Sequence, residues 1–523
     1  MGNAFIYRDS LEKMAEPYEI EEHQVAVELS RIEHAMEAVR QDLHVSAQRI
    51  EADTSGKLAQ IFEVHQAMLQ DPSLRKQIAE LVENELIDGA QALGRVFRRW
   101  ERKFRAMAEQ SQQQHAEDVT DLRRRLLREM AGVKTTPLEK MPPGRVLVAR
   151  RLLPSDTVTL PRRAVVGIVL DFGGQGSHAA LLAEALGIPT VAQIPNAVDR
   201  IEENDLIVVD GSRGEVMINP DVATQERYGG EIQSAQTRSA QIKQLARQPA
   251  QTLDGTIVAV LANVGGREDV VAAAENGADG VGLYRMEQFY LSRKTPPCRI
   301  ELLTELREVF APLKGKPITA RLLDLGGDKP LPFLRIPLED NPFLGRRGVR
   351  FLLEYPDLLD TQLQALSEFS KEQDVRILVP MVTVDEDLIR VRTRLVDAAK
   401  KSGLDKPPPL GAMIETPAAA LSIGDITKHA DFVSIGTNDL TQYTMAAGRE
   451  NPLVNSYFIE GHPAVMRLVS IIAQEAAVPV AICGELARQL DAIPTLVGLG
   501  IHTLSVAPPL VPVVKETVRQ IRL

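Results

Sequence analysis

One histidine in a glycine-rich stretch has the setting that covalent chemistry requires. His178 stands in Gly173–Ala180, directly after the apolar run Ala164–Leu170, which predicts a buried strand. Ser177 is a good helix N-cap and Gly187 a good helix end, so His178 falls in the first turn of a short helix. Free N–H groups and the helix dipole favour an anion there. The pattern predicts a histidine able to carry a phosphoryl group, although a capping loop with an incidental histidine would look the same.

A second set of polar residues stands at the ends of strand-like runs in the C-terminal half. Eight such runs alternate with helical stretches: Thr256–Val264, Asp279–Arg285, Ile318–Leu325, Val375–Val382, Leu410–Glu415, Phe432–Thr437, Val480–Cys483 and Thr503–Val506. Their number and spacing predict a (β/α)8 TIM barrel, a fold whose active sites lie at the carboxyl ends of the strands. The residues at those ends are Asn263, Arg285, Arg321, Asp324, Glu415, Asn438, Asp439 and Cys483. We therefore predict one shared active site rather than scattered surface charge.

The chemistry of these residues favours a divalent cation and a small anion. Glu415, Asn438 and Asp439 offer oxygen ligands without a pair of thiolates or imidazoles, which suits Mg²⁺. The alternative is that the two carboxylates only form salt bridges. Forked donors for phosphate and carboxylate groups are supplied by Arg285, Arg321, Arg347 and Arg449. Phosphoenolpyruvate carries both groups and fits such a site.

Composition restricts the class of protein that must position these residues. The chain has 523 residues, which suggests about three domains. Its net charge of −11 argues against a nucleic-acid binder and suits a partner with a basic docking face. The two cysteines, Cys298 and Cys483, give no disulfide framework. No apolar run approaches the roughly 20 residues of a membrane span. We expect a cytoplasmic protein without a nucleic-acid or membrane partner.

The elements around His178 and the barrel divide the chain into an α/β multidomain protein. Residues 1–17 with 139–225 read as a swivelling β/α phosphohistidine domain, into which residues 18–138 insert a helical bundle. Residues 226–250 read as a polar helical linker with a hinge, and residues 251–523 as the barrel. Four amphipathic stripes carry the bundle: Val25–Leu43, Leu58–Leu69, Leu93–Met107 and Val119–Met130. His65, on the second stripe, is expected to be a packed core histidine.

These motifs resemble those of the phosphoenolpyruvate-utilising enzymes, and in particular the phosphoenolpyruvate–protein phosphotransferases (enzyme I of the bacterial phosphotransferase system). The resemblance covers nearly the whole chain. It is carried by Gly173–Pro189, Gly282–Glu287, Asp324–Lys329, Asn341–Arg347, Glu415–Ala420, Ser434–Tyr443 and Cys483–Ala487. It implies that His178 takes the phosphoryl group of phosphoenolpyruvate, releasing pyruvate, and passes it to a histidine of the phosphocarrier protein HPr. This is the first step of sugar uptake by that system.

The resemblance also implies roles for individual residues. Phosphoenolpyruvate contacts are implied for Arg285, Arg321, Asn438, Asp439 and Arg449, with Arg347 and Lys329 also placed in the substrate site. Glu415 and Asp439 are the implied Mg²⁺ ligands, and Cys483 the implied acid that protonates enolpyruvate. Thr157 matches a threonine that contacts the phosphoryl group. The helical region is the implied docking site for HPr, and the barrel the implied surface of a homodimer.

The sequence departs from the family pattern at the phosphohistidine segment. Gly176 stands where threonine is common, and Glu184 where arginine is common. A non-catalytic or weakened regulator that binds phosphoenolpyruvate or HPr therefore stays open. A phosphoenolpyruvate synthase or dikinase is less favoured, because the chain has a helical bundle in place of a large nucleotide-binding domain. Family members usually carry a further strand before Ala4, and its absence suggests a truncated or shifted start.

Overall fold

The computed structural model describes two compact units, residues 1–235 and 236–523. The described residues are 1–8, 18–53, 65–66, 68–105, 110–133, 137–159, 165–173, 180, 183, 187–291, 293–326, 331, 333–334, 339–448 and 452–523. The segment that holds His178 lies outside them, as do Lys329, Arg449, Gly176 and Glu184. The side chain of Thr157 is also outside the description.

The first unit contains a six-stranded mixed sheet in the order β4-β3-β2-β1-β5-β6. Its strands are β1 (Gly2–Tyr7), β2 (Arg145–Ala149), β3 (Val165–Leu170), β4 (Thr190–Val191), β5 (Leu206–Asp210) and β6 (Glu215–Ile218). Strands β1 to β4 run parallel, whereas β5 and β6 form an antiparallel hairpin at one side. Because β1 pairs along its length with β2, the intervening helical segment is an insertion between two neighbouring strands.

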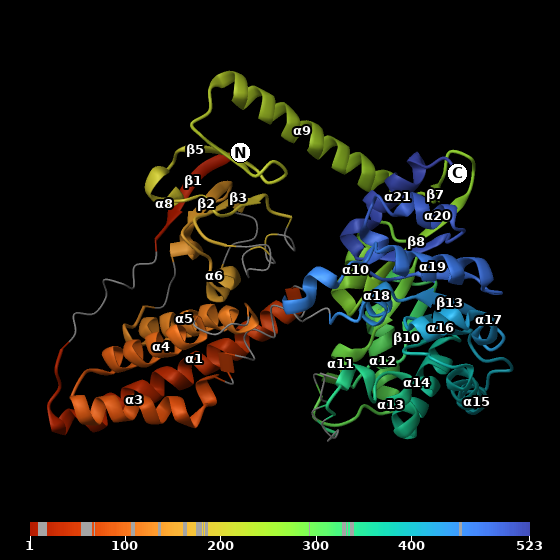
Figure 1. The fold of residues 1–523 in the computed structure, drawn as a ribbon, viewed down its shortest axis with the longest axis horizontal. Coiled ribbons are helices and arrows are strands. Elements are labelled where there is room, and N and C mark those ends of the chain that lie inside the picture. Colours follow the sequence, from red (N-terminus) through yellow and green to blue (C-terminus); the bar gives the residue numbers. More distant parts are fainter. Residues whose placement is uncertain are drawn as a thin grey trace. The chain divides into compact units, whose positions relative to one another are not determined.

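Among the described residues, the inserted bundle contains the helices α1 (Val25–Asp53), α3 (Pro72–Glu85), α4 (Gly89–Arg105) and α5 (Gln110–Met130). Figure 1 shows them packed side by side. The predicted stripe residues Met36, Leu93 and Leu126 are buried, and they share one apolar cluster with the sheet residues Leu147 and Ile168. The stripe analysis missed α3, which begins at Pro72 behind Asp71, whose side chain accepts from Ser73 N at 2.8 Å.

Two predicted stripes extend beyond what the structure describes, at residues 58–64 and at Met107. His65 is fully buried, as predicted. Its environment is more polar than expected, because its Nε2 lies 3.1 Å from the carboxylate of Asp118.

Most of the predicted linker belongs to one continuous helix, α9 (Val222–Leu245), shown in yellow-green in Figure 1, while its last residues lie beyond the end of this helix. The boundary between the two compact units falls inside this helix. Residues 230–241 are exposed almost throughout, so this stretch has little tertiary packing to stabilise it. Tyr228 near the start of α9 is buried, and its hydroxyl contacts Asp210 at 3.3 Å. The boundaries proposed for the three domains and the linker stay a prediction.

The second unit is a closed barrel of eight parallel strands, as predicted. They are β8 (Ile257–Val264), β9 (Val281–Arg285), β10 (Ile318–Arg321), β11 (Val375–Val379), β12 (Leu410–Ile414), β13 (Phe432–Ile435), β14 (Val480–Ile482) and β15 (Thr503–Val506). Pairing of β15 with β8 closes the barrel. A short strand, β7 (Ala250–Gln251), adds antiparallel to β8. Each predicted strand-like run contains one observed strand.

Helices alternate with these strands along the chain. They are α10 (Arg267–Glu275), α11 (Glu287–Leu291), α12 (Arg299–Phe310), α13 (Val349–Glu354), α14 (Pro356–Phe369), α15 (Asp385–Lys401), α16 (Pro417–Leu421), α17 (Ile423–Ile426), α18 (Thr437–Met445), α19 (Pro463–Glu475), α20 (Ile493–Gly498) and α21 (Val511–Gln520). Across the described ranges, no helix combines the length and apolarity that a bilayer crossing requires.

Candidate active site

The barrel brings the predicted strand-end residues to one edge. Arg285 and Arg321 are the last residues of β9 and β10, and these two residues are partners in the strand pairing. Glu415 directly follows β12, and Cys483 directly follows β14. Asn438 and Asp439 lie in the first turn of α18, just after β13. Because the strands are parallel and neighbouring, all of these residues lie at the carboxyl end of the barrel.

Arg321 is held in place by two carboxylates. Its NH2 group donates to Glu287 Oε1 at 2.6 Å, and its NH1 group to Asp324 Oδ2 at 3.1 Å. Burial opposes its charge, but Glu287 and Asp324 outweigh that and raise the pKa of Arg321. Arg321 Nε and Glu287 Oε2 are buried without a hydrogen-bond partner among the described residues. These two atoms could therefore form hydrogen bonds with a ligand.

Arg347 joins the elements that follow β10 and β13. It donates to both oxygens of Asp439, at 2.8 and 3.1 Å, and to both oxygens of Asp324, at 3.2 and 3.1 Å. Burial opposes its charge, yet Asp324 and Asp439 raise the pKa of Arg347. Tyr443 lies 3.4 Å from the same guanidinium. This doubly forked contact fixes Asp439, one of the two predicted metal ligands.

Glu415 is the most strongly perturbed acid of the site. It is fully buried, and its Oε1 accepts from Met381 N at 2.6 Å. Met381 holds a left-handed backbone, with φ of 57°, to make this contact. Burial, with Asp439 and Asp324 nearby, raises the pKa of Glu415 to about 8, although Arg321 and Arg347 act in the opposite direction. Glu415 therefore keeps its proton at neutral pH in the metal-free protein.

Gly436 leaves space beside this carboxylate. A Cβ at Gly436 would lie 2.8 Å from Glu415 Oε2, so any larger residue would crowd that oxygen. Within the described ranges, no group of three or more His, Cys, Asp or Glu side chains is arranged to hold a metal ion by itself. Glu415 and Asp439 alone would thus need further oxygen ligands to complete a Mg²⁺ site.

Cys483 is a buried thiol directly after β14. Leu283, Leu378, Met413 and Phe432 form an apolar cluster with it. Burial raises the pKa of Cys483, while a hydrogen bond from Ser434 Oγ, 3.3 Å from Sγ, acts against this shift. The group is therefore a protonated thiol at neutral pH, as a proton donor must be. Cys298, by contrast, is exposed.

Hydrogen bonds also fix the segments that follow β13 and β14. Asn438 Oδ1 accepts from Glu485 N at 2.8 Å. A Cβ at Gly484 would lie 1.9 Å from Thr437 Oγ1, so this close approach requires glycine. Asn263 donates to the carbonyl of Cys483 at 3.0 Å. The position of the thiol is thus set by contacts from two other strands of the barrel.

Sequence reasoning missed four residues of this site. Glu287, Met381, Ser434 and Tyr443 contact the predicted residues only through long-range packing. The one available signal was their position, because Glu287 follows Arg285 closely and Ser434 precedes Asn438. The spacing alone did not show which side chains they would meet.

In the first unit, the described residues that precede the His178 segment lie at the carboxyl ends of the neighbouring strands β2 and β3. Asp171 N donates to Ala149 O at 3.1 Å, and Phe172 N donates to Arg150 O at 2.9 Å. The chain leaving β3 toward His178 therefore starts beside the chain leaving β2. Gly187 has φ of 63°, and Ile188 N donates to Ala183 O at 2.9 Å. The left-handed φ of Gly187 is one that favours glycine, and its predicted role at a helix end stays a prediction.

Known families match the chain over most of its length. The descriptions are "PEP-utilising enzyme, N-terminal" over residues 1–114, "PEP-utilising enzyme, mobile domain" over 141–214 and "PEP-utilising enzyme, PEP-binding domain" over 239–523.

Curated relatives extend this similarity to whole proteins. The chain is 33% identical to the phosphoenolpyruvate-protein phosphotransferase of Priestia megaterium, covering 95% of this chain and 88% of the relative. It is 34% identical to the protein of the same name from Haloferax volcanii, with 94% and 87% covered. A solution structure described as Enzyme I (nEIt) is 29% identical and covers 45% of this chain and 94% of its own, with a TM-score of 0.39.

The raised pKa of Glu415 predicts how stability depends on pH. The folded protein holds a proton between the ordinary value of 4.5 and about 8, where the unfolded chain releases it. Stability of the metal-free protein should therefore fall as pH rises through this interval. Glu415→Gln stays neutral and should remove that loss, so its melting temperature should exceed that of the wild type at pH 8.5 by more than at pH 5.5.

Calorimetric melting in the presence of a chelator measures this difference. Glu475→Gln, which makes the same chemical change at the exposed end of α19, is the matched control and should follow the wild type. An identical pH dependence of Glu415→Gln and wild type would show that Glu415 is already ionised in the folded protein.

Proposed function

The chain belongs to the PEP-utilising enzymes, and we propose that it is a phosphoenolpyruvate–protein phosphotransferase acting on an HPr-type carrier. The observation that supports this most strongly is the buried arginine–carboxylate site at the carboxyl end of the barrel, within the part that matches the PEP-binding description. In this reaction, the phosphoryl group of phosphoenolpyruvate moves to His178 and then to a histidine of the carrier.

We infer the substrate-binding roles from the family resemblance, and the geometry of the described residues supports part of them. Arg285 and Arg321, with Asn438, Arg449 and Lys329, would hold the phosphate and carboxylate of phosphoenolpyruvate. Arg321 is already oriented by Glu287, so little side-chain entropy is lost on binding. Arg347 keeps Asp439 and Asp324 in place and offsets their charge.

Glu415 and Asp439 would hold Mg²⁺. The donor set fits this ion, because the site offers carboxylate oxygens, and a cation would stabilise the ionised form of Glu415, which burial and the neighbouring acids disfavour. When bound, the cation neutralises charge on the phosphoryl group that is transferred. Substrate oxygens or water would complete the coordination. Proton release from Glu415 would accompany metal binding.

Cys483 completes the chemistry at carbon. The P–O bond of phosphoenolpyruvate breaks as the bond from phosphorus to the His178 nitrogen forms, leaving the enolate of pyruvate. Its methylene carbon then takes the proton of the Cys483 thiol, and solvent returns a proton to the thiolate. Burial keeps this thiol protonated until the enolate forms.

The proposed cycle requires His178 to reach the barrel site and afterwards a separate carrier, so a hinge is part of the mechanism. The C-terminal end of α9 is fixed to the barrel: Arg519 donates to Leu245 O at 2.8 Å, and the buried Lys515 donates to Ala246 O at 2.9 Å. The other end is fixed by Tyr228. Between these anchors lies Gly229-Gly230, where a Cβ would touch nothing within 4 Å. We place the hinge there, because paired glycines weaken a helix locally.

The remaining assignments follow the family. We propose that the helical bundle docks the HPr-type carrier, that the barrel forms a homodimer, and that the protein works in the cytoplasm. The departures at Gly176 and Glu184 motivate the second candidate, a weakened regulator, and the labelling experiment below separates the two.

His178→Ala should abolish labelling of the protein from phosphoenolpyruvate carrying ³²P at phosphorus, because it removes the accepting nitrogen. Wild-type protein with Mg²⁺ should acquire acid-labile, base-stable label and pass it to purified HPr with release of pyruvate. Label of this kind on the variant would refute the assignment of His178. A wild type that binds phosphoenolpyruvate without turnover would favour the regulator.

Cys483→Ser should slow pyruvate formation by about 10²–10⁴, the usual contribution of a general acid, because serine is a far weaker acid. Affinity for phosphoenolpyruvate should stay the same, since the arginines provide it. Cys298→Ser, at an exposed position, is the control. Pyruvate formed in D₂O from substrate labelled stereospecifically at the methylene should be chiral with wild type and racemic with Cys483→Ser. Chiral pyruvate at the wild-type rate would remove Cys483 from the mechanism.

Replacing both hinge glycines, Gly229→Ala with Gly230→Ala, should stiffen α9, because Ala favours the helix by about 1 kcal/mol over Gly at each position. Transfer from phosphoenolpyruvate should slow severalfold, whereas transfer back from phosphorylated HPr to His178, which needs only the first unit, should not change. Gly424→Ala, also in a helix with open space around its Cβ position, is the control. Equal slowing of both transfers would place the hinge elsewhere.

A further inference from the structure

The chain that leaves β10 enters the barrel site without regular structure. Residues 322–325 are all buried, yet they belong to no helix or strand. The strand-type hydrogen bonding ends with Leu322 N, which donates to Leu378 O at 2.9 Å. Buried N–H groups beyond this point still need acceptors. The segment starts directly after Arg321 and carries Asp324, so its path decides where both of these site residues lie.

Two side chains supply the missing acceptors. Leu323 N donates to Gln362 Oε1 at 2.9 Å, and Asp324 N donates to Glu287 Oε1 at 3.0 Å. Glu287 is the first residue of α11, and Gln362 lies in the middle of α14. Because a backbone N–H can only donate, the oxygen of the Gln362 amide must face Leu323. The backbone of this segment is therefore held by side chains from two helices that are far apart in sequence.

Gln362 is a polar residue on an apolar face of α14. It is fully buried, as are Leu359, Leu363 and Leu366 on the same helix. Its Nε2 donates to Leu358 O at 2.9 Å, one turn earlier in the helix. An apolar side chain could pack on this face without the cost of burying an amide. The contribution specific to glutamine is thus the hydrogen bond that it accepts from the segment after β10.

The carboxylate of Asp324 joins the two arginines of the site. It accepts from Arg321 NH1 at 3.1 Å, and from Nε and NH2 of Arg347 at 3.2 and 3.1 Å. Arg347 in turn donates to both oxygens of Asp439. Charged hydrogen bonds of this length tolerate little displacement of the backbone that carries the acceptor. The bond to Gln362 is made one residue before this carboxylate, so its loss would be felt by both arginines.

We propose that Gln362 is a positioning residue of the barrel site, acting through the backbone of Leu323 and Asp324 on Arg321 and Arg347. It lies within α14 instead of at a strand end, and it acts on the substrate only through these residues. The inference rests on the proposed function, because phosphoenolpyruvate is the substrate proposed for the arginines. Neither the motifs nor the strand ends of the sequence singled out this glutamine.

Gln362→Met keeps the length of the side chain and removes its strong acceptor, so that Leu323 N loses its partner. The segment should then shift to satisfy this N–H elsewhere. Affinity of the full chain for phosphoenolpyruvate with Mg²⁺ should fall about tenfold, and kcat/KM for pyruvate release with HPr by about 10- to 100-fold, since small misplacements of binding groups cost that much. Titration calorimetry and a pyruvate assay measure the two effects.

Two further variants separate positioning from stability. Gln362→Glu keeps an oxygen for Leu323 N, and burial should keep its carboxyl neutral, so affinity and turnover should return to within about threefold of wild type. Gln373→Met is the matched control. Gln373 is also a buried glutamine, but its Oε1 accepts from Gly315 N at 3.0 Å, before β10 begins and at the other end of that strand. It should lower the melting temperature much as Gln362→Met does and leave the affinity unchanged.

Should Gln362→Met not fold, Gln362→Asn replaces it, because its amide is one methylene too short to reach Leu323 N. Unchanged affinity for phosphoenolpyruvate in a folded Gln362 variant that melts at a lower temperature would overturn the inference. An equal loss of affinity in Gln373→Met would overturn it as well, since the effect would then be general destabilisation. A wild type that binds no phosphoenolpyruvate with Mg²⁺ present would instead overturn the proposed function.

Discussion

The site depends on a buried cluster of acids and arginines at the carboxyl end of the barrel. Asp324, Glu415 and Asp439 meet at the carboxyl end of the barrel opposite Arg321 and Arg347, and burial with the neighbouring acids raises the pKa of Glu415 to about 8. Such an arrangement is costly in a protein by itself. In the function that we propose, a divalent cation would stabilise the ionised carboxylates and the arginines would bind the anionic substrate.

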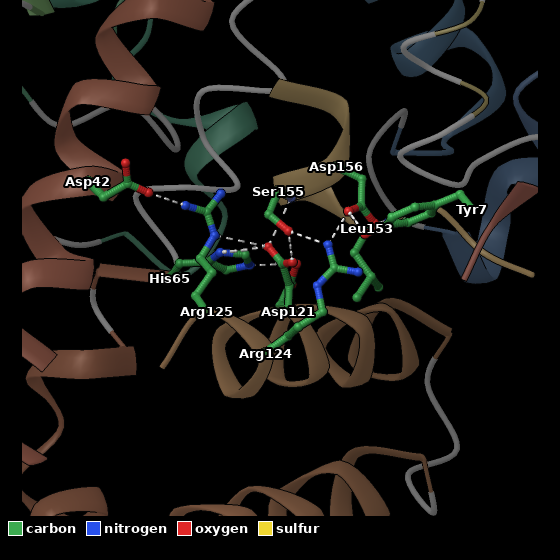
Figure 2. Close-up of polar contacts among 10 residues, drawn as sticks. Tyr7, Asp42, His65, Asp121, Arg124, Arg125, Leu153, Ser155 and Asp156 are labelled. Atoms are coloured by element: carbon green, nitrogen blue, oxygen red, sulfur yellow. Dashed lines mark hydrogen bonds and ion pairs between the residues drawn. The ribbon is translucent and has the colours of Figure 1, made fainter. Parts of the chain in front are cut away.

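The first unit also contains buried acids that pair with arginines. Between α5 and the short helix α6 (Pro154–Thr159), described acids and arginines pair directly, as Arg124 does with Asp156 (Figure 2). At the barrel edge, Arg347 pairs with Asp324 and Asp439, while the neighbouring Glu415 is buried with a raised pKa. The two networks are connected by α9, whose ends are anchored and whose Gly229-Gly230 pair has no packing to stiffen it. In the proposed reaction, His178 must reach phosphoenolpyruvate and then the carrier, and this requires a flexible connection between two well-ordered units.

Local sequence patterns were sufficient to predict the barrel and most of the polar residues at the carboxyl ends of its strands. Apolar runs such as Leu410–Ile414 are strands because both of their faces are buried, and the residue after each run then falls at the carboxyl edge. Glu287, Ser434 and Tyr443 were missed, because what they contact depends on packing between segments far apart in sequence. Helix α3 was missed because its apolar stripe, Leu74, Ile78 and Val82, is short. His65 was correctly expected in a core, but its carboxylate partner Asp118 could not be read from spacing.

Calorimetric titration of phosphoenolpyruvate and Mg²⁺ into the full chain, in buffers of different ionisation enthalpy, tests the central claim most directly. If Glu415 and Asp439 take the cation, phosphoenolpyruvate should bind tightly only with Mg²⁺ present. Binding at pH 7 should release close to one proton per chain, because the cation displaces the proton of Glu415, and this release should vanish near pH 9.5 and in Glu415→Gln. Binding that is independent of Mg²⁺, or that releases no proton at pH 7, would contradict the account.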